Sequence, residues 1–338
     1  MSTLPQDRSF STPQEHGDGV WSLRVPIPDN PLGYTLIYVL RTNTGVLLID
    51  AGWDCDEAWE ALETGLAHCG YLMSDVQATL ITHAHPDHIG LALRVRNASG
   101  CRVFMGEDER VDEACYGGDA LHERLLFLKS QGVPDREIED FSASIVSAPF
   151  PPQHWKADTM VMDGLSIVVD GAELTAIATP GHTNGHMCYL DRTRKFLFTG
   201  DHLLTTITPN ISTFLLDGSD PLGDYLSSIA KIDCYDVARV MPGHQTPFSE
   251  FNERTRIASL HHETRLRELE NIVRITQGAS TWQLCELVPW SKPLSHFAPF
   301  MRYSALGETL AHLVHLRELN RVEYLGHGTW SASEPLES

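Results

Sequence analysis

The 338-residue chain lacks several features that would direct its interpretation toward a disulfide-rich or membrane protein. Its seven cysteines are an odd number without any C-x-x-C pair, so neither a disulfide framework nor a cysteine zinc site is expected. No stretch reaches the roughly 18 consecutive apolar residues of a membrane-spanning helix. The first residues also lack the basic start and apolar core of a signal peptide. We therefore expect a cytoplasmic protein with no membrane partner.

Positive charge is also scarce. Lys and Arg number 25 against 45 Asp and Glu, which gives a formal net charge of −20 at pH 7. This excess raises the electrostatic barrier to any polyanion, so nucleic acid is not an expected partner. Hydrophobic residues make up 42% of the chain, which is ample for a buried core. The length suits one large domain and a smaller one.

The first part of the chain predicts an α/β domain. Residues 1–19 are polar and rich in Ser, Pro, Gly and Asp, so we expect a flexible N-terminal segment. Apolar periodicity and turn residues then predict three antiparallel strands, a helix closed by Gly70, a strand, a short helix and another strand. These elements are predicted over residues 21–26, 34–41, 45–50, 54–68, 76–82, 89–95 and 101–105. Such strand and helix alternation is typical of α/β proteins.

The region 108–155 interrupts this pattern, and we interpret it as a helical insertion near the rim of the active site. Helices are expected around residues 107–114 and 120–130, followed by a proline-bearing loop over 147–152. A helical cover without substrate contact is an equal alternative. Strand character then returns at residues 160–162, 166–169, 174–179, 187–191, 195–199 and 237–241.

After about residue 252 the composition changes to long helical runs. Helices are predicted over 254–276 and 304–320, with a capping box at Ser280 that begins a short helix between them. A hairpin over 321–325 and 329–332 follows, so the region 253–338 has the outline of a winged helix. In so acidic a chain this α+β domain is expected to pack or to gate substrate rather than to read DNA.

Four potential metal ligands occur within six positions directly after the apolar run 78–81: His83, His85, Asp87 and His88. So dense a cluster fits metal-site chemistry far better than core packing. His83 and His85 are two residues apart, so an extended backbone directs both side chains to one side. Asp87 and His88 fall where the chain turns into a helix.

Three further candidates share one local pattern, in which a strand ends in a tight glycine turn and a ligand follows. His182 follows Thr179-Pro180-Gly181, Asp201 follows Thr199-Gly200, and His244 follows Pro242-Gly243. Glycine permits positive φ and close backbone approach, so such turns can direct side chains from different strands to one point. With the first cluster they supply enough ligands for two metal ions.

These motifs, in this order and with Asp50 after the first strands, resemble the metallo-β-lactamase superfamily over about residues 20–250. The resemblance implies an αββα sandwich as the catalytic domain, over residues 20–252. It also implies a division of the ligands: His83, His85 and His182 on one metal, Asp87, His88 and His244 on the other, and Asp201 bridging both. His and carboxylate ligands without thiolate suit zinc, iron or manganese, and we expect two divalent ions, with zinc favoured.

The reaction expected from such a centre is hydrolysis, in which a hydroxide between the metals attacks a carbonyl or phosphoryl centre and Asp87 relays a proton to the leaving group. A bridging aspartate is usual in the thioesterases, lactonases and ribonucleases of the superfamily and usually absent from its zinc β-lactamases. The quorum-sensing lactonases carry a tyrosine three residues beyond that aspartate, where this chain has Leu204. Antibiotic and lactone hydrolysis are therefore less favoured.

The C-terminal region, with Gly307-Glu308-Thr309 leading into Arg321-Val322-Glu323, resembles the tail of the beta-lactamase-like protein 2 subfamily. That group includes an endoribonuclease and fungal polyketide thioesterases. The −20 charge ranks ester or thioester hydrolysis of a small-molecule or acyl-carrier substrate above RNA cleavage. Endoribonuclease activity remains the alternative, with a metal-sensing DNA-binding regulator further behind. The oligomeric state stays open, a homo-oligomer included.

The remaining polar candidates have lesser expected roles. Asp50 is expected to hold a ligand or its loop by hydrogen bonds without touching the metal. His202, next to Asp201, either contacts substrate or packs. His186 is expected in a loop, with a supporting role as the minor alternative. The pairs His261/His262 and His312/His315 lie outside any ligand motif, so surface or helix-packing roles are favoured.

Overall fold

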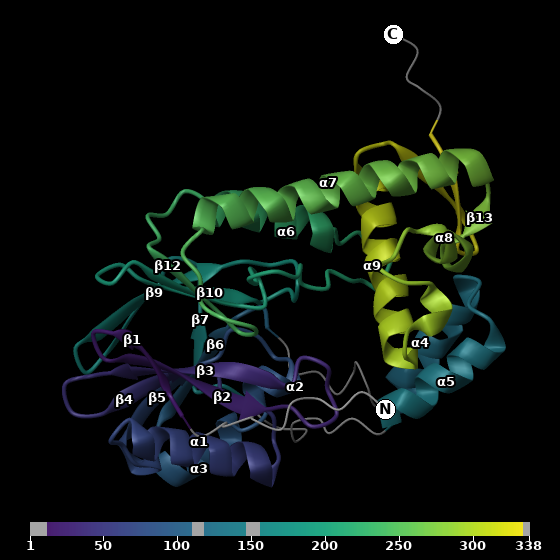
Figure 1. The fold of residues 1–338 in the computed structure, drawn as a ribbon. Coiled ribbons are helices and arrows are strands. Elements are labelled where there is room, and N and C mark those ends of the chain that lie inside the picture. Colours follow the sequence, from purple (N-terminus) through teal and green to yellow (C-terminus); the bar gives the residue numbers. More distant parts are fainter. Residues whose placement is uncertain (1–11, 110–117, 147–155, 334–338) are drawn as a thin grey trace.

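A computed structural model describes residues 12–109, 118–146 and 156–333. Two β-sheets pack face to face, and helices cover the outer face of each (Figure 1). The N-terminal sheet has the strand order β1-β2-β3-β4-β5-β6-β7 in the described part of the chain. Pairing is antiparallel from β1 to β4 and parallel from β4 to β7. Its strands are β1 (Gln14–Gly17), β2 (Val20–Pro26), β3 (Tyr34–Arg41), β4 (Val46–Ile49), β5 (Val76–Leu80), β6 (Arg102–Gly106) and β7 (Thr159–Val161).

The second sheet follows in the order β12-β11-β10-β9-β8 and is antiparallel except for the parallel pair β11 and β12. Helix α6 (Pro221–Ile232) and the long helix α7 (Phe251–Thr276) cover its outer face (Figure 1). The strands are β8 (Ser166–Val169), β9 (Ala172–Ala178), β10 (Met187–Asp191), β11 (Phe196–Gly200) and β12 (Arg239–Pro242).

The core is layered in the same way. Between the sheets, the buried rings of Tyr38 and Phe198 meet edge to face with centroids 5.1 Å apart. Helices α1 (Asp56–His68) and α3 (Ala92–Ser99) cover the outer face of the N-terminal sheet and bury Leu62 and Val95 against it. Each fully buried side chain of this size stabilises the fold by roughly 1.5–3 kcal/mol. The predicted αββα sandwich is confirmed.

One N-terminal expectation is wrong. The segment 1–19 was predicted to lack structure, but residues 14–17 form β1 and pair with β2, with Glu15 opposite Trp21. The strand is held by backbone pairing rather than by apolar content, which explains why composition did not reveal it. His16 is buried there, and its Nε2 lies 2.9 Å from Ser22 Oγ. Residues 1–11 lie outside the described part of the chain.

The helix predicted over 89–95 is also wrong in extent. It is split into α2 (Pro86–Ile89) and α3, with Gly90 at the break. A Cβ at Gly90 would lie 2.5 Å from Pro86 O and 2.8 Å from Gly52 O. The chain therefore passes close to the loop after β4 here, and Leu91 N donates to Gly52 O of that loop at 2.9 Å. The break separates the short helix that carries Asp87 and His88 from the one that covers the sheet.

The insertion packs against the C-terminal region. Helices α4 (Gly118–Ser130) and α5 (Asp135–Val146) share a cluster of buried apolar side chains with α9, and Arg302 of α9 pairs with Glu137 of α5 at 2.6 Å. The helix α5 was not predicted. Of the helix expected over 107–114, residues 107–109 form no helix, and the rest lies outside the described residues, as does the loop 147–152.

Beyond α7 the chain forms a small unit of helices and a sheet with strand order β13-β15-β14. The predicted capping box is present, because Ser280 Oγ accepts from Gln283 N and Gln283 Oε1 accepts from Ser280 N. That this unit is a winged helix, and that it forms a separate domain from residue 253, stay predictions. Its elements are β13 (Ala279–Ser280), α8 (Thr281–Leu287), α9 (Pro299–Glu318), β14 (Val322–Gly326) and β15 (Thr329–Ala332), and short 3-10 turns lie at Met73–Asp75 and Leu294–His296.

Among the helices that the structure describes, none has the length and hydropathy needed to cross a membrane.

Candidate metal centre

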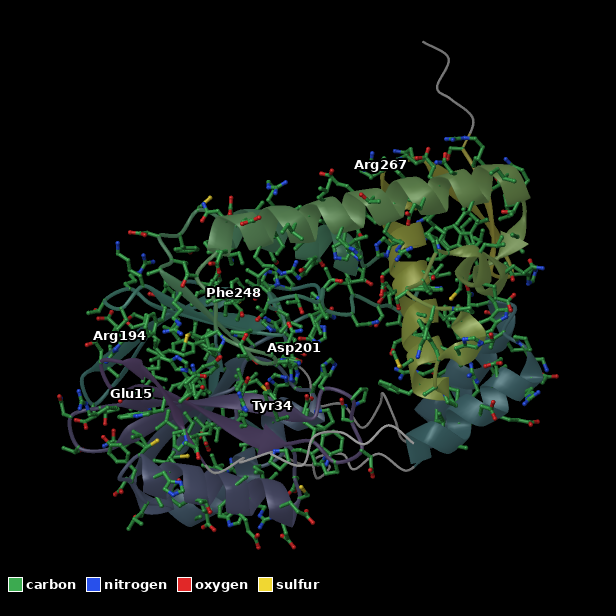
Figure 2. All side chains as sticks on the ribbon, viewed as in Figure 1. Glu15, Tyr34, Arg194, Asp201, Phe248 and Arg267 are labelled. Atoms are coloured by element: carbon green, nitrogen blue, oxygen red, sulfur yellow. The ribbon has the colours of Figure 1, made fainter. Side chains whose placement is uncertain are left out.

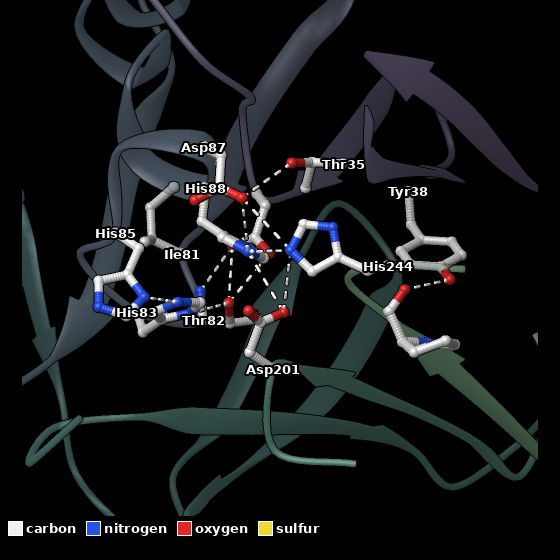
Figure 3. A network of polar contacts seen from close by, with 12 residues as sticks. Thr35, Tyr38, Ile81, Thr82, His83, His85, Asp87, His88, Asp201 and His244 are labelled. Atoms are coloured by element: carbon white, nitrogen blue, oxygen red, sulfur yellow. Dashed lines mark hydrogen bonds and ion pairs between the residues drawn. The ribbon is translucent and has the colours of Figure 1, made fainter. Parts of the chain in front are cut away.

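Asp201 lies between the two sheets on the side of the sandwich toward the C-terminal helices (Figure 2), and the predicted ligands lie close together (Figure 3). They come from the loops that follow β5, β9, β11 and β12 and from the short helix α2. Hydrogen bonds between the sheets hold this end of the sandwich together. Tyr189 of β10 donates its hydroxyl to Ile81 O at 2.7 Å, and Met187 N donates to Thr82 O at 2.8 Å.

Glycine is required at two of the ligand turns because the loops approach each other closely. A Cβ at Gly200 would lie 2.6 Å from Thr82 Oγ1, and one at Gly243 would lie 2.6 Å from His88 Cε1. Gly200 also has a positive φ of 47°. The strand, glycine and ligand pattern of the sequence therefore has a physical basis here, since larger residues would push the loops apart.

One set of imidazoles converges, and we name it the three-histidine group: His83, His85 and His182. The ligand atoms of its members lie within 4.8 Å of one another. His83 Nε2 is 2.9 Å from His85 Nδ1, and His182 Nε2 is 3.0 Å from the same atom. Two ligands bound tetrahedrally to zinc at about 2.1 Å lie roughly 3.4 Å apart, so the spacing suits one ion.

The carboxylate group, Asp87, His88 and His244, forms a second set (Figure 3), and a third combination, His83, His88 and Asp201, joins the two. His244 Nε2 lies 3.3 Å from Asp87 Oδ2 and 3.4 Å from His88 Nε2. Asp87 Oδ2 also accepts a long hydrogen bond of 3.4 Å from Thr35 Oγ1. This set contains a negatively charged member of its own, which the three-histidine group lacks.

Asp201 lies between the two groups (Figure 3). Its Oδ1 is 3.4 Å from His88 Nε2 and 3.3 Å from His244 Nε2, while Oδ2 is 3.7 Å from His182 Nε2. One carboxylate oxygen thus faces each group, which is the position a bridging ligand would need. Oδ1 is buried without a hydrogen-bond partner in the described part of the chain, so a bound cation would satisfy it.

The outward nitrogens of four histidines have hydrogen-bonding neighbours, which orients the rings. His83 Nδ1 lies 3.1 Å from Thr82 Oγ1, and His88 Nδ1 lies 2.7 Å from Asp50 Oδ2. His182 Nδ1 and His244 Nδ1 face backbone carbonyls, at 2.8 Å from Asn210 O and 3.0 Å from Tyr34 O. When Nδ1 carries the proton, the Nε2 lone pair faces the centre, as metal ligation requires.

Asp50 lies behind the ligands, as expected from its place after β4. It is buried, has a positive φ of 62°, and accepts from Thr82 N at 2.7 Å as well as facing His88. Thr82 Oγ1 donates to the same carboxylate at 2.9 Å. One side chain therefore fixes both the His88 ring and the start of the loop that carries His83.

The electrostatic surroundings of the two groups differ. Burial, reinforced by neighbouring imidazoles, holds the pKa of His83 well below its usual range and lowers that of His85 to about 3. In the carboxylate group burial also opposes charge on histidine, but the carboxylates of Asp201 and Asp87 raise the pKa of His244 to about 10. The first group thus offers neutral bases, and the second attracts positive charge. A cation at the second group would replace the proton that His244 otherwise holds, because only a neutral imidazole ligates a metal.

Two histidines near the centre point to packing. His202 is fully buried, with its ring 5.0 Å from the Tyr225 ring and 5.9 Å from the His186 ring. This environment favours the packing alternative over substrate contact. His186 is buried as well, with Nδ1 2.8 Å from Thr179 Oγ1 and its ring 5.2 Å from that of His83.

Sequence reasoning missed several supporting groups. The carbonyls of Tyr34 and Asn210 leave no sequence signal, because every residue has a carbonyl. Glu109 is different, since it lies in the short acidic segment after β6, although not directly after the strand as Asp50 does after β4. A search for carboxylates after strand ends would have included it together with Glu107 and Asp108.

The fold and this convergence of imidazoles and carboxylates define a class, the metal-dependent hydrolases. The model of the metallo-beta-lactamase superfamily matches residues 30–244, which contain every ligand candidate. The chain belongs to that superfamily.

Individual proteins and a solved structure are also similar to this chain over most of its length. The chain is 28% identical over 275 residues to a beta-lactamase-like protein 2 homolog of Caenorhabditis elegans, covering 79% of this chain and 77% of the relative. It is 26% identical over 283 residues to an atrochrysone carboxyl ACP thioesterase of Aspergillus fumigatus, covering 79% and 73%. The crystal structure of a metallo-beta-lactamase family protein from Thermus thermophilus is 29% identical and superposes with a TM-score of 0.76 over 93% of this chain and 98% of that one.

Proposed function

We propose that this hydrolase cleaves an ester or thioester of the acyl-CoA or acyl-carrier type with two divalent cations. The observation that carries the proposal is Asp201, which presents one oxygen to each of two ligand groups. In the proposed division His83, His85 and His182 hold one cation, Asp87, His88 and His244 hold the other, and Asp201 bridges them. The bound cations would supply an activated water and polarise the carbonyl oxygen of the substrate.

The chain's own residues would organise the reaction around that chemistry. The hydrogen bonds that the imidazole Nδ1 atoms make to Asp50, Asn210 O and Tyr34 O keep the rings in one orientation, so little reorganisation is needed when substrate binds. Asp87 is our candidate for moving a proton to the leaving group. Its Oδ2 faces His244 and Thr35, and about 15% of its side chain is exposed, whereas His88 is fully buried.

The acyl substrate is supported by two observations. A relative that covers most of this chain is named an ACP thioesterase. The net charge of −20 disfavours the polyanionic substrate of the alternative, an endoribonuclease. Zinc is the proposed metal, with iron or manganese as alternatives, because imidazole and carboxylate ligands accept all three.

The C-terminal unit is proposed to form part of the substrate side. Asn210, whose carbonyl faces His182, donates its side-chain amide to Ser304 O of α9 at 3.3 Å. Thr213 N in the same loop donates to Gly307 O at 3.2 Å. The segment 210–213 therefore contacts both His182 and α9, and we place the acyl part of the substrate beside it.

The test is a hydrolysis screen of acyl-CoA, acyl-carrier thioester, lactone and single-stranded RNA substrates, with metal content measured on the same sample. We expect thioester or ester hydrolysis to exceed RNA cleavage by orders of magnitude and to disappear with the metals. Metal-dependent RNA cleavage without thioester hydrolysis would replace the proposal with its alternative.

A further inference from the structure

Glu109 is a buried carboxylate that the proposed chemistry does not use. Only 6% of the residue is exposed, and it lies just after β6. No Lys or Arg pairs with it among the residues that the structure describes. Burial raises the pKa of Glu109 to about 7, although hydrogen bonds from Thr183, Ala84 and Gly185 oppose that shift. Burying a carboxylate costs free energy unless hydrogen bonds compensate for the lost water.

Its contacts join the loops of the three-histidine group. Oε1 accepts from Ala84 N at 2.9 Å, and Ala84 lies between His83 and His85. Oε2 accepts from Thr183 Oγ1 at 2.7 Å and from Gly185 N at 3.0 Å, in the loop that begins with His182. One oxygen holds each loop, so the carboxylate sets the distance between them.

The backbone around Glu109 is packed too closely for these loops to adjust freely. A Cβ at Gly185 would lie 1.9 Å from Glu109 N, and one at Gly106 would lie 2.2 Å from Gly185 O. The turn that carries Glu109 and the loop that carries His182 are thus in direct contact. His244 of the carboxylate group belongs to the separate loop after β12, while Asp87 and His88 lie on α2, which directly follows His85; none of the three hydrogen bonds reaches these members themselves.

We propose that Glu109 is a positioning residue for the three-histidine group, which fixes the affinity of the cation held by His83, His85 and His182 without acting on the other cation. The inference rests on the proposed division of ligands. The Glu109 carboxylate would then affect the cation held by the three-histidine group and leave the cation of the carboxylate group unaffected.

The experiment is a titration of metal-free protein with Zn²⁺ against a chromophoric chelator. Wild type is expected to bind two equivalents. Glu109→Ala should weaken one of the two binding steps by about 10- to 100-fold, the range found for partners that orient metal ligands, and leave the other within about threefold. Glu109→Gln should fall between, because its single oxygen can still accept from Thr183 and Gly185 while its amide faces Ala84 N.

Two backgrounds locate the affected step. In His244→Ala, which retains the three-histidine group, adding Glu109→Ala should produce the full loss of affinity. In His85→Ala, which retains the carboxylate group, the same addition should produce none. Asp191→Asn is the matched control, since Asp191 is also buried but binds Arg194 at the opposite end of β10. It should lower the melting temperature without changing either affinity.

The outcomes separate the two claims. Wild type binding fewer than two equivalents would contradict the proposed function. Wild type binding two, with Glu109→Ala and Glu109→Gln unchanged or weakening both steps equally, would overturn the role of Glu109.

Discussion

The candidate metal centre and a pair of buried histidines elsewhere in the described residues, His262 and His312, differ in what surrounds them. In the candidate metal centre the imidazole nitrogens converge on Asp201, and hydrogen-bonding groups hold the outward nitrogens. In the other cluster, between α7 and α9, His262 Nδ1 lies 3.2 Å from His312 Nε2, its one hydrogen-bonding neighbour among the described residues, and His312 Nδ1 donates to Glu308 O at 2.8 Å. Neither ring has a carboxylate within ion-pair distance in the described residues. Convergence on acidic oxygen, rather than the number of histidines, distinguishes a candidate ligand set from helix packing.

The largest expected effect comes from Asp201→Ala. Because Asp201 faces both groups, its loss should lower kcat/KM for the thioester by more than about a hundredfold and reduce the bound metal. Steady-state kinetics and metal analysis check this. Asp163→Asn, which removes a surface pair with Lys231, should leave both unchanged. Full activity in Asp201→Ala would contradict the proposed bridge.

The structure brings together the seven ligand candidates named from the sequence, while their binding of metal stays a prediction. They lie in short segments at strand ends, and glycine turns mark three of them, so local pattern was enough to name them; their division between two ions came from the family resemblance. The supporting carbonyls of Tyr34 and Asn210 could not be predicted, because they depend on which strand crosses behind the ligand. The same limit explains β1, whose pairing with β2 has no apolar pattern, and the break at Gly90, which arises from contact with a distant loop.

A smaller effect is expected from Asp50→Asn, which touches the centre only through His88 and Thr82. Asparagine keeps the size but cannot accept from all the donors, so the His88 ring should become less well oriented. We expect roughly a 10- to 100-fold loss of affinity for one cation with an unchanged count at saturating metal. Equilibrium dialysis against buffered Zn²⁺ measures it. Complete loss of both ions would mean that Asp50 has a larger role than orientation.

Removal of the metals should destabilise the fold, because the ligands come from loops on both sheets. At a free metal concentration of 100 times Kd, each site contributes about 2.7 kcal/mol to the free energy of unfolding. A chelator should therefore lower the melting temperature of wild type in a calorimeter. The double variant His262→Leu/His312→Leu should show the same chelator-induced shift, since the C-terminal pair binds no metal in this account.

The two histidine clusters are also expected to differ in how pH changes the free energy of unfolding. Burial lowers the pKa of His262 to about 2 and that of His312 to about 3, and Arg265, His261 and His315 nearby also disfavour charge. Between pH 6.5 and 3 the unfolded chain therefore binds protons that the folded pair does not. Stability is full above about pH 6.5 and falls as the pH decreases.

The double Leu variant should lose this acid sensitivity. Its free energy of unfolding, measured by urea titration from pH 7 to 4, should fall less steeply than that of wild type by up to about 2.7 kcal/mol per pH unit, the value for two protons. Parallel slopes in the two proteins would show that the pair is accessible to protons in the folded state.

The most direct test of the central claim is metal analysis by mass spectrometry of purified wild type, of His83→Ala and of the double Leu variant. We predict about two equivalents in wild type and in the double Leu variant, and a loss in His83→Ala. Well under one equivalent in wild type, or a loss that follows His262 and His312 instead of His83, would contradict the account.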